Sequence, residues 1–103
     1  MQASPKPPRV LHLHLKGCYF DAIQRGEKTC EYRLASTWEP RLAGKTFDEI
    51  WLKRGYPRRN DRHRILRRKW NGYRTELRRH PHFGRAPVEV LAIDVTQRVE
   101  AES

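Results

Sequence analysis

Gly26, Lys28, Glu31 and Arg33 form the pattern G-x-K-x-x-E-x-R, which concentrates charged side chains in a short stretch. In an extended strand Glu31 and Arg33 fall on one face, because side chains alternate with period two. Their proximity predicts an ionised Glu31 and leaves donors of Arg33 for a phosphate or a base edge. Lys28 reaches the same side only from the turn after Gly26 or through a bulge. We expect a ligand pocket here; the alternative is a charge network that only stabilises the fold.

The same pattern raises the question of catalysis. Metal-free cleavage of RNA needs a general base and a general acid. Lys28 and Glu31 are the first candidates for these roles, and the others are His12, His14, Lys53 and Tyr56. Lys53 and Tyr56, at the end of a later predicted strand, are expected to line the ligand cleft with Lys28, Glu31 and Arg33. Binding without catalysis is the first interpretation. A hydrolase acting on RNA or modified nucleosides and a protein-interaction module are the alternatives.

The formal net charge of +10 is concentrated in residues 54–85, which hold twelve Lys or Arg and two acidic residues. A localised block of this kind favours a polyanion partner, and RNA is expected because arginine binds phosphates with a planar fork and aromatic side chains stack on bases. The alternatives are a solvated loop and, for Trp70, a place in the core. The residues expected to contact nucleic acid are Arg54, Arg58, Arg59, Arg62, Arg64, Arg67, Arg68, Lys69 and Trp70.

Four of the histidines and the two cysteines are the residues that could form a metal site or a disulfide. His12 with His14 and His80 with His82 form two His-x-His pairs, but neither has a carboxylate or cysteine at ligand spacing. We therefore expect no metal and no cofactor. Cys18 and Cys30 are the two cysteines, and they are expected to be reduced in a chain that starts without a signal peptide.

The elements that must position these residues follow from periodicity and turn signals. Strand 10–15 alternates three leucines with polar residues, and Gly26 stands where a left-handed C-cap would end a short helix. Asn71-Gly72 is a strong turn signal. The predicted elements are strand 10–15, helix 16–26, strand 28–34, a loop or helical turn at 37–45 interrupted by Pro40, strand 47–56, one strand or a hairpin within 60–77, and strand 88–99.

The motif in its strand, helix, strand context resembles the signature of the ASCH domain family. The likeness continues through YFDAIQRGEKTCEYR, WEPRL, FDEIWLKRGY and VEVLAIDV. It implies an α+β fold, a small PUA-like β-barrel with one or two short helices, and RNA binding in a cleft lined by the motif. Some relatives cleave RNA, and one branch removes the acetyl group of N4-acetylcytidine with a lysine, a threonine three positions later and a distant glutamate. Glu31 stands at the threonine position here, so that triad does not map.

Length and composition limit the architecture. With 103 residues, 37% hydrophobic and 33% charged, the chain has room for one domain with a thin core. We expect a flexible tail at 1–9 and a single ASCH-like domain at 10–100. The sequence contains no apolar run of membrane-helix length, so a cytoplasmic protein without a membrane partner is expected. The oligomeric state stays open.

Overall fold

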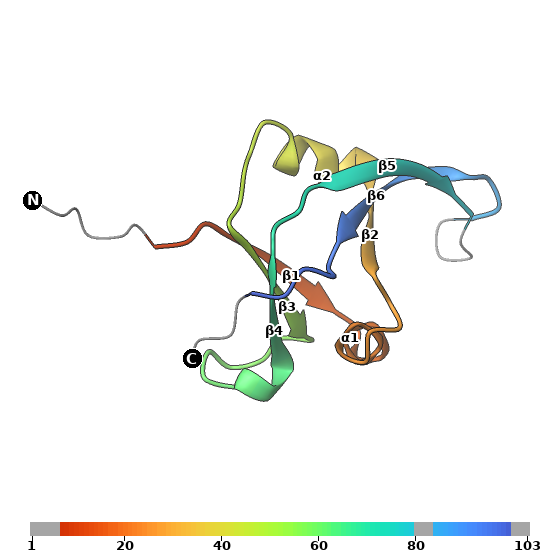
Figure 1. Cartoon of the computed structure of the whole chain (residues 1–103). Coiled ribbons are helices and arrows are strands. Elements are labelled where there is room, and N and C mark those ends of the chain that lie inside the picture. Colours follow the sequence, from red (N-terminus) through yellow and green to blue (C-terminus); the bar gives the residue numbers. More distant parts are fainter. Residues whose placement is uncertain (1–6, 80–83, 100–103) are drawn as a thin grey trace, which may run out of the picture.

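The structure is a computed structural model that describes residues 7–79 and 84–99. Two helices and six strands make up the regular structure of this part, together with a short 3₁₀ turn (Figure 1). In chain order the elements are β1 (Val10–Leu15), α1 (Gly17–Gln24), β2 (Cys30–Leu34), α2 (Ala35–Leu42), β3 (Glu49–Arg54), the 3₁₀ turn Arg62–Arg64, β4 (Ile65–Lys69), β5 (Tyr73–Arg78) and β6 (Val88–Asp94).

The strands form two three-stranded sheets. The first has the order β1-β3-β4, in which β1 and β3 are parallel and β3 and β4 antiparallel. The second has the order β2-β6-β5 and is antiparallel throughout. The α+β class is thus confirmed, whereas the expected closed barrel is wrong: in the described residues the two sheets are not joined by a strand ladder, and the isolated bridge joins Arg68 of β4 to Arg98, which lies beyond the end of β6.

The Asn71-Gly72 segment connects the two sheets instead of closing a hairpin. Gly72 has φ +76°, but residues 70–72 are irregular backbone rather than a turn. However, β4 pairs with β3 and β5 pairs with β6, so the expectation of a hairpin is wrong. Asn71 Nδ2 donates to Asp94 at 2.7 Å, and the Trp70 N–H donates to the Asp48 carbonyl at 3.1 Å. Figure 1 shows the chain rising here from one sheet to the other.

The two helices differ in how well they were predicted. α1 lies within the predicted range and ends before Gly26, which has φ +81°. α2 occupies a segment that we expected to be a loop or a single turn, and Pro40 lies inside it. Pro40 removes one backbone hydrogen bond, but Ala35 and Leu42 are buried against the core, and this burial stabilises the helix.

Both sheets and both helices contribute to one core. The three leucines of β1 are buried while His12 and His14 are exposed, as the alternation predicts. The largest fully buried side chains include Phe20 of α1, Ile50 of β3 and Ile93 of β6. Cys18 and Cys30 are free thiols. Within the described ranges, no helix is long and apolar enough to cross a membrane.

Candidate functional site

The turn after α1 places Lys28 beside Glu31. The left-handed Gly26 donates to the Ile23 carbonyl at 3.0 Å, and the N–H of Lys28 bonds to the Ala22 carbonyl at 3.2 Å. Lys28 therefore precedes β2, and its Nζ lies 3.7 Å from Glu31 Oε1. Lys28 and Glu31 could come together through a turn after Gly26 or through a bulge in the strand, and the structure contains the turn.

Arg33 completes the charge cluster and links it to β1. Its Nη2 lies 2.9 Å from Glu31 Oε2 and donates to the His14 carbonyl at 2.9 Å. The guanidinium also packs over the Trp38 ring, with 5.1 Å from Cζ to the ring centroid. Its Nε is buried and, in the part of the chain described, has no hydrogen-bond partner. Arg33 is therefore held in place by Glu31, the His14 carbonyl and the Trp38 ring.

Glu31 is itself 6% exposed, and burial raises the pKa of this carboxyl above its ordinary value, outweighing the attraction of Arg33 and Lys28. The neighbouring cations favour the ionised form, and burial opposes them because the carboxyl lies on the same face of the sheet as Ile93 and Leu91, which belong to the core.

These residues border a pocket of about 440 Å³ at the edges of the two sheets. Its lining has five basic side chains and a single carboxylate. Lys28 Nζ lies 4.7 Å and Arg78 Cζ 4.6 Å from the centroid of the Tyr32 ring. The pocket combines positive charge with aromatic surface, and its lining residues are His14, Leu15, Lys16, Tyr19, Lys28, Glu31, Tyr32, Arg33, Arg78, Arg79 and Val90.

Several of these lining residues were not predicted as site residues. Lys16 follows the last residue of β1, and Arg79 follows the last residue of β5. Both positions come from strand ends that converge on the motif only in the folded chain. Tyr32 lies within the motif, between Glu31 and Arg33, and Tyr19 precedes it by seven residues, so closeness to the motif in sequence is the signal that could have found them.

Lys53 and Tyr56 are not among the residues that line this pocket. Lys53 lies on β3, paired in register with His14 of β1. Tyr56 is 87% exposed and stacks on the His14 ring with a centroid separation of 4.3 Å. Because His14 does line the pocket, Tyr56 is next to it rather than in it.

The basic segment is divided into paired and solvent-facing arginines. Arg54 lies 3.3 Å from Asp21, Arg64 lies 3.5 Å from Asp61, and Arg67 lies 2.9 Å from Glu49. The other predicted arginines at the surface, all exposed, are Arg58, Arg59 and Arg62. Lys69 is exposed at the end of β4.

Arg68 and Trp70 point to the interior rather than to a surface ligand. Arg68 is 8% exposed, and it donates to the Val95 carbonyl at 3.1 Å and to the Arg67 carbonyl at 3.0 Å. Burial lowers the pKa of its guanidinium from the ordinary value. Trp70 packs edge-on against Phe47 at 5.2 Å beside the core. We therefore remove both from the set of phosphate-binding and base-stacking residues.

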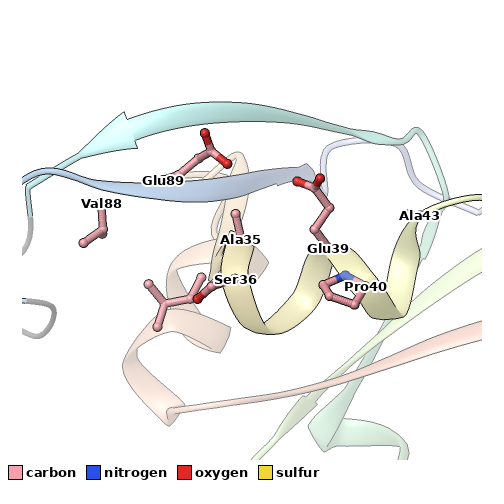
Figure 2. Close-up of a pocket in the computed structure, with 8 residues that line it drawn as sticks. Ala35, Ser36, Glu39, Pro40, Ala43, Val88 and Glu89 are labelled. Carbon is pink, nitrogen blue, oxygen red and sulfur yellow. The ribbon is translucent and has the colours of Figure 1, made fainter.

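A second, larger hollow of about 580 Å³ lies between α2 and β6 (Figure 2). Figure 2 shows Glu39 on α2 and Glu89 on β6, with Ala35, Ser36 and Pro40 also on α2. Its charged lining residues are both acidic, and it contains none of the predicted site residues. The smaller basic pocket is therefore the candidate site.

Within residues 7–79 and 84–99, no three His, Cys, Asp or Glu side chains are grouped as metal ligands would be. His80 and His82, one of the two His-x-His pairs, lie outside the described residues. In comparisons with known protein families, characterised proteins and solved structures, the chain matches none of them.

Proposed function

We propose that this chain binds RNA, or one nucleotide unit of it, in the pocket formed by Lys28, Glu31 and Arg33. The observation that carries the proposal is the composition of the pocket: five cations and two tyrosines around one buried carboxyl. Cations attract phosphate, aromatic rings hold a base by stacking, and a buried carboxyl can bond to a base edge. A nucleotide presents these three chemistries in one molecule.

The charge of the pocket supports an anionic ligand. Arg33 and Lys28 are held near Glu31, and Arg78 lies 2.9 Å from Glu76. Lys16 and Arg79 have no carboxylate partner in the part of the chain that the structure describes. Two cations are thus available for a phosphate without breaking an ion pair.

The resemblance of the motif to the ASCH family also supports RNA binding. We propose that residues 10–100 form a single domain related to the PUA-like folds. A cytoplasmic location and an RNA partner are parts of this proposal. The solvent-facing Arg58, Arg59 and Arg62 would hold phosphates outside the pocket, since flexible exposed arginines make contacts that position RNA without reading its sequence.

Catalysis is the second candidate, and one observation favours it. A carboxyl with a raised pKa in a pocket is a common feature of general bases and acids. Lys28 Nζ, 3.7 Å away, is the nearest group that could stabilise a developing charge. On this proposal Glu31 would accept a proton from the attacking group of an RNA or nucleoside substrate.

A binding panel tests the proposal. Fluorescence anisotropy is measured with single-stranded RNA, duplex RNA, tRNA and single-stranded DNA, and the same RNAs are then run on a gel to detect cleavage. Binding of at least one RNA without products supports the binding function. Products that disappear with Glu31→Gln while binding persists support the hydrolase. No binding of any nucleic acid overturns both and favours a protein-interaction module.

A further inference from the structure

The outer face of the first sheet carries an aromatic surface that shares only His14 with the residues lining the pocket. We name it the aromatic face, and its residues are His12, His14, Trp51, Lys53, Tyr56 and Arg67. Their neighbours in sequence, such as Leu13 and Leu52, point into the core. The aromatic face therefore lies on the solvent side of β1, β3 and β4, which Figure 1 shows as one sheet.

Tyr56 is held in place although it is almost fully exposed. Gly55 adopts φ +66°, donates to the Leu15 carbonyl at 2.8 Å, and accepts a 2.8 Å bond from His14 Nδ1 through its own carbonyl. These bonds fold the chain back after β3, so that Tyr56 stacks on His14 with an angle of 22° between the rings. One face of Tyr56 rests on imidazole and the ring remains 87% exposed. The local backbone thus presents a flat aromatic ring to solvent.

Trp51 provides a second fixed ring. It lies on β3 opposite His12, which is two residues before His14 on β1. Its Nε1 donates to Glu49 Oε1 at 2.9 Å, and His12 meets it edge-on at 5.6 Å. Arg67 lies over the ring at 5.7 Å and binds Glu49 through two hydrogen bonds of 2.9 and 3.0 Å. The indole N–H and the carboxylate are therefore both satisfied, and the ring cannot turn freely.

The charge around the two rings, and the separation of the two histidines that contact them, suit a nucleic-acid strand. His12 and His14, which contact Trp51 and Tyr56, are two residues apart on β1, or about 7 Å along the strand. The surrounding charge is positive, with Lys53 on the face itself and the exposed Arg58 and Arg59 following Tyr56. Cationic tracks with rings for successive bases are the usual means of holding single strands.

We propose that the aromatic face binds single-stranded RNA by base stacking, with Tyr56 on His14 receiving the base next to the one in the pocket. This rests on the proposed function, because His14 both supports Tyr56 and lines the pocket. A duplex cannot use this surface, since its bases are already stacked on one another. Stacking also places no demand on base identity, so the face adds affinity without sequence preference.

The test compares Tyr56→Ala, Tyr56→Phe and Leu77→Ala with the wild type. Leu77 is the matched control, because it is 74% exposed and lies on β5 of the other sheet. The probes are oligouridylate of about ten nucleotides, within the usual site size, an RNA duplex of equal length, and uridine monophosphate. Tyr56→Ala should weaken binding of the single strand by roughly 5- to 150-fold. Tyr56→Phe and Leu77→Ala should bind like the wild type.

Two further readouts separate this proposal from the pocket. The salt dependence of oligouridylate binding should be the same for Tyr56→Ala and wild type, because a ring releases no counterions. Uridine monophosphate should bind both equally. If the monophosphate does not bind but the single strand depends on Tyr56, the pocket function fails and the aromatic face stands. If Tyr56→Ala binds the single strand as tightly as wild type, if the duplex binds as tightly as the single strand, or if no RNA binds, the aromatic face is overturned.

Discussion

The Arg33 guanidinium donates a 2.9 Å hydrogen bond to the His14 carbonyl, and this bond joins β2, at the edge of one sheet, to β1, at the edge of the other. The same nitrogen lies 2.9 Å from Glu31. The side chains of Arg33 and Glu31 are 19% and 8% exposed. Arg33 therefore has two roles, as a wall of the pocket and as a connection between the sheets.

Replacing Arg33 by alanine should destabilise the fold. It leaves the buried Glu31 without its closest cation, and loss of one partner of a buried pair typically costs about 3–5 kcal/mol, a large share of the stability of a small domain. Urea denaturation measures the change. Arg25→Ala is the control, because Arg25 pairs with Glu27 at the surface, where the side chains are 57% and 62% exposed. Equal midpoints for the two variants would contradict a structural role for Arg33.

The pH dependence of stability should reveal the raised pKa of Glu31. The ordinary pKa of a glutamate carboxyl is about 4.5. As the pH rises from this value, Glu31 loses its proton in the unfolded chain before it does so in the folded chain. The free energy of unfolding of wild type should therefore fall relative to that of Glu31→Gln, until the pH passes the raised pKa. Other carboxyls, such as Glu49 with its lowered pKa, are present in both proteins and cancel.

Urea denaturation of wild type and Glu31→Gln from acidic to neutral pH measures this difference. A difference that stays constant with pH would show that burial does not raise the Glu31 pKa. A difference that changes in the opposite sense would show that Arg33 and Lys28 outweigh burial.

The sequence predicted the elements well where the pattern was local. Strand 10–15 follows from its alternating leucines, and the end of α1 follows from Gly26. The partners of each strand could not be predicted in the same way. Asn71-Gly72 is a sequence typical of hairpin turns. However, β5 pairs with β6, which is distant in sequence, and this pairing decides the sheet to which β5 belongs.

In the candidate site, too, local patterns were predictable from the sequence and contacts between distant residues were not. Lys28, Glu31 and Arg33 were expected together from a motif of eight residues, and the structure does place them together. The raised pKa of Glu31 is not evident from the motif, because burial depends on the whole core rather than on neighbouring charges. The burial of Arg68 is not evident for a similar reason: composition does not show which side of a strand in a highly charged segment faces inward.

The salt dependence of RNA binding tests the exposed arginines. Combined replacement of Arg58, Arg59 and Arg62 by alanine should lower the slope of log affinity against log salt by about 2, at roughly 0.7 per contact with a single strand. Affinity should fall alike for all sequences, because phosphate contacts carry no sequence information. Anisotropy titrations at several salt concentrations measure the slope.

The control for this experiment removes the same charge elsewhere. Arg9, Arg41 and Lys45 are exposed and lie outside the basic segment and the pocket. Their combined replacement by alanine should leave the slope close to that of wild type. If both triple variants lose the same slope, the protein attracts RNA through its overall charge and the segment has no special role.

The central claim is that Lys28 faces a ligand, and one pair of variants tests it most directly. Lys28 lies 3.7 Å from Glu31, whereas Arg33 lies 2.9 Å from it and also bonds to the His14 carbonyl, so Lys28→Ala should lower the melting temperature much less than Arg33→Ala does. Loss of a charged hydrogen bond, typically about 1.5–3 kcal/mol, predicts binding of RNA that is roughly 10- to 150-fold weaker. Lys45→Ala, which removes an exposed lysine away from the pocket, should bind like wild type. Unchanged RNA affinity of a folded Lys28→Ala protein would contradict the account.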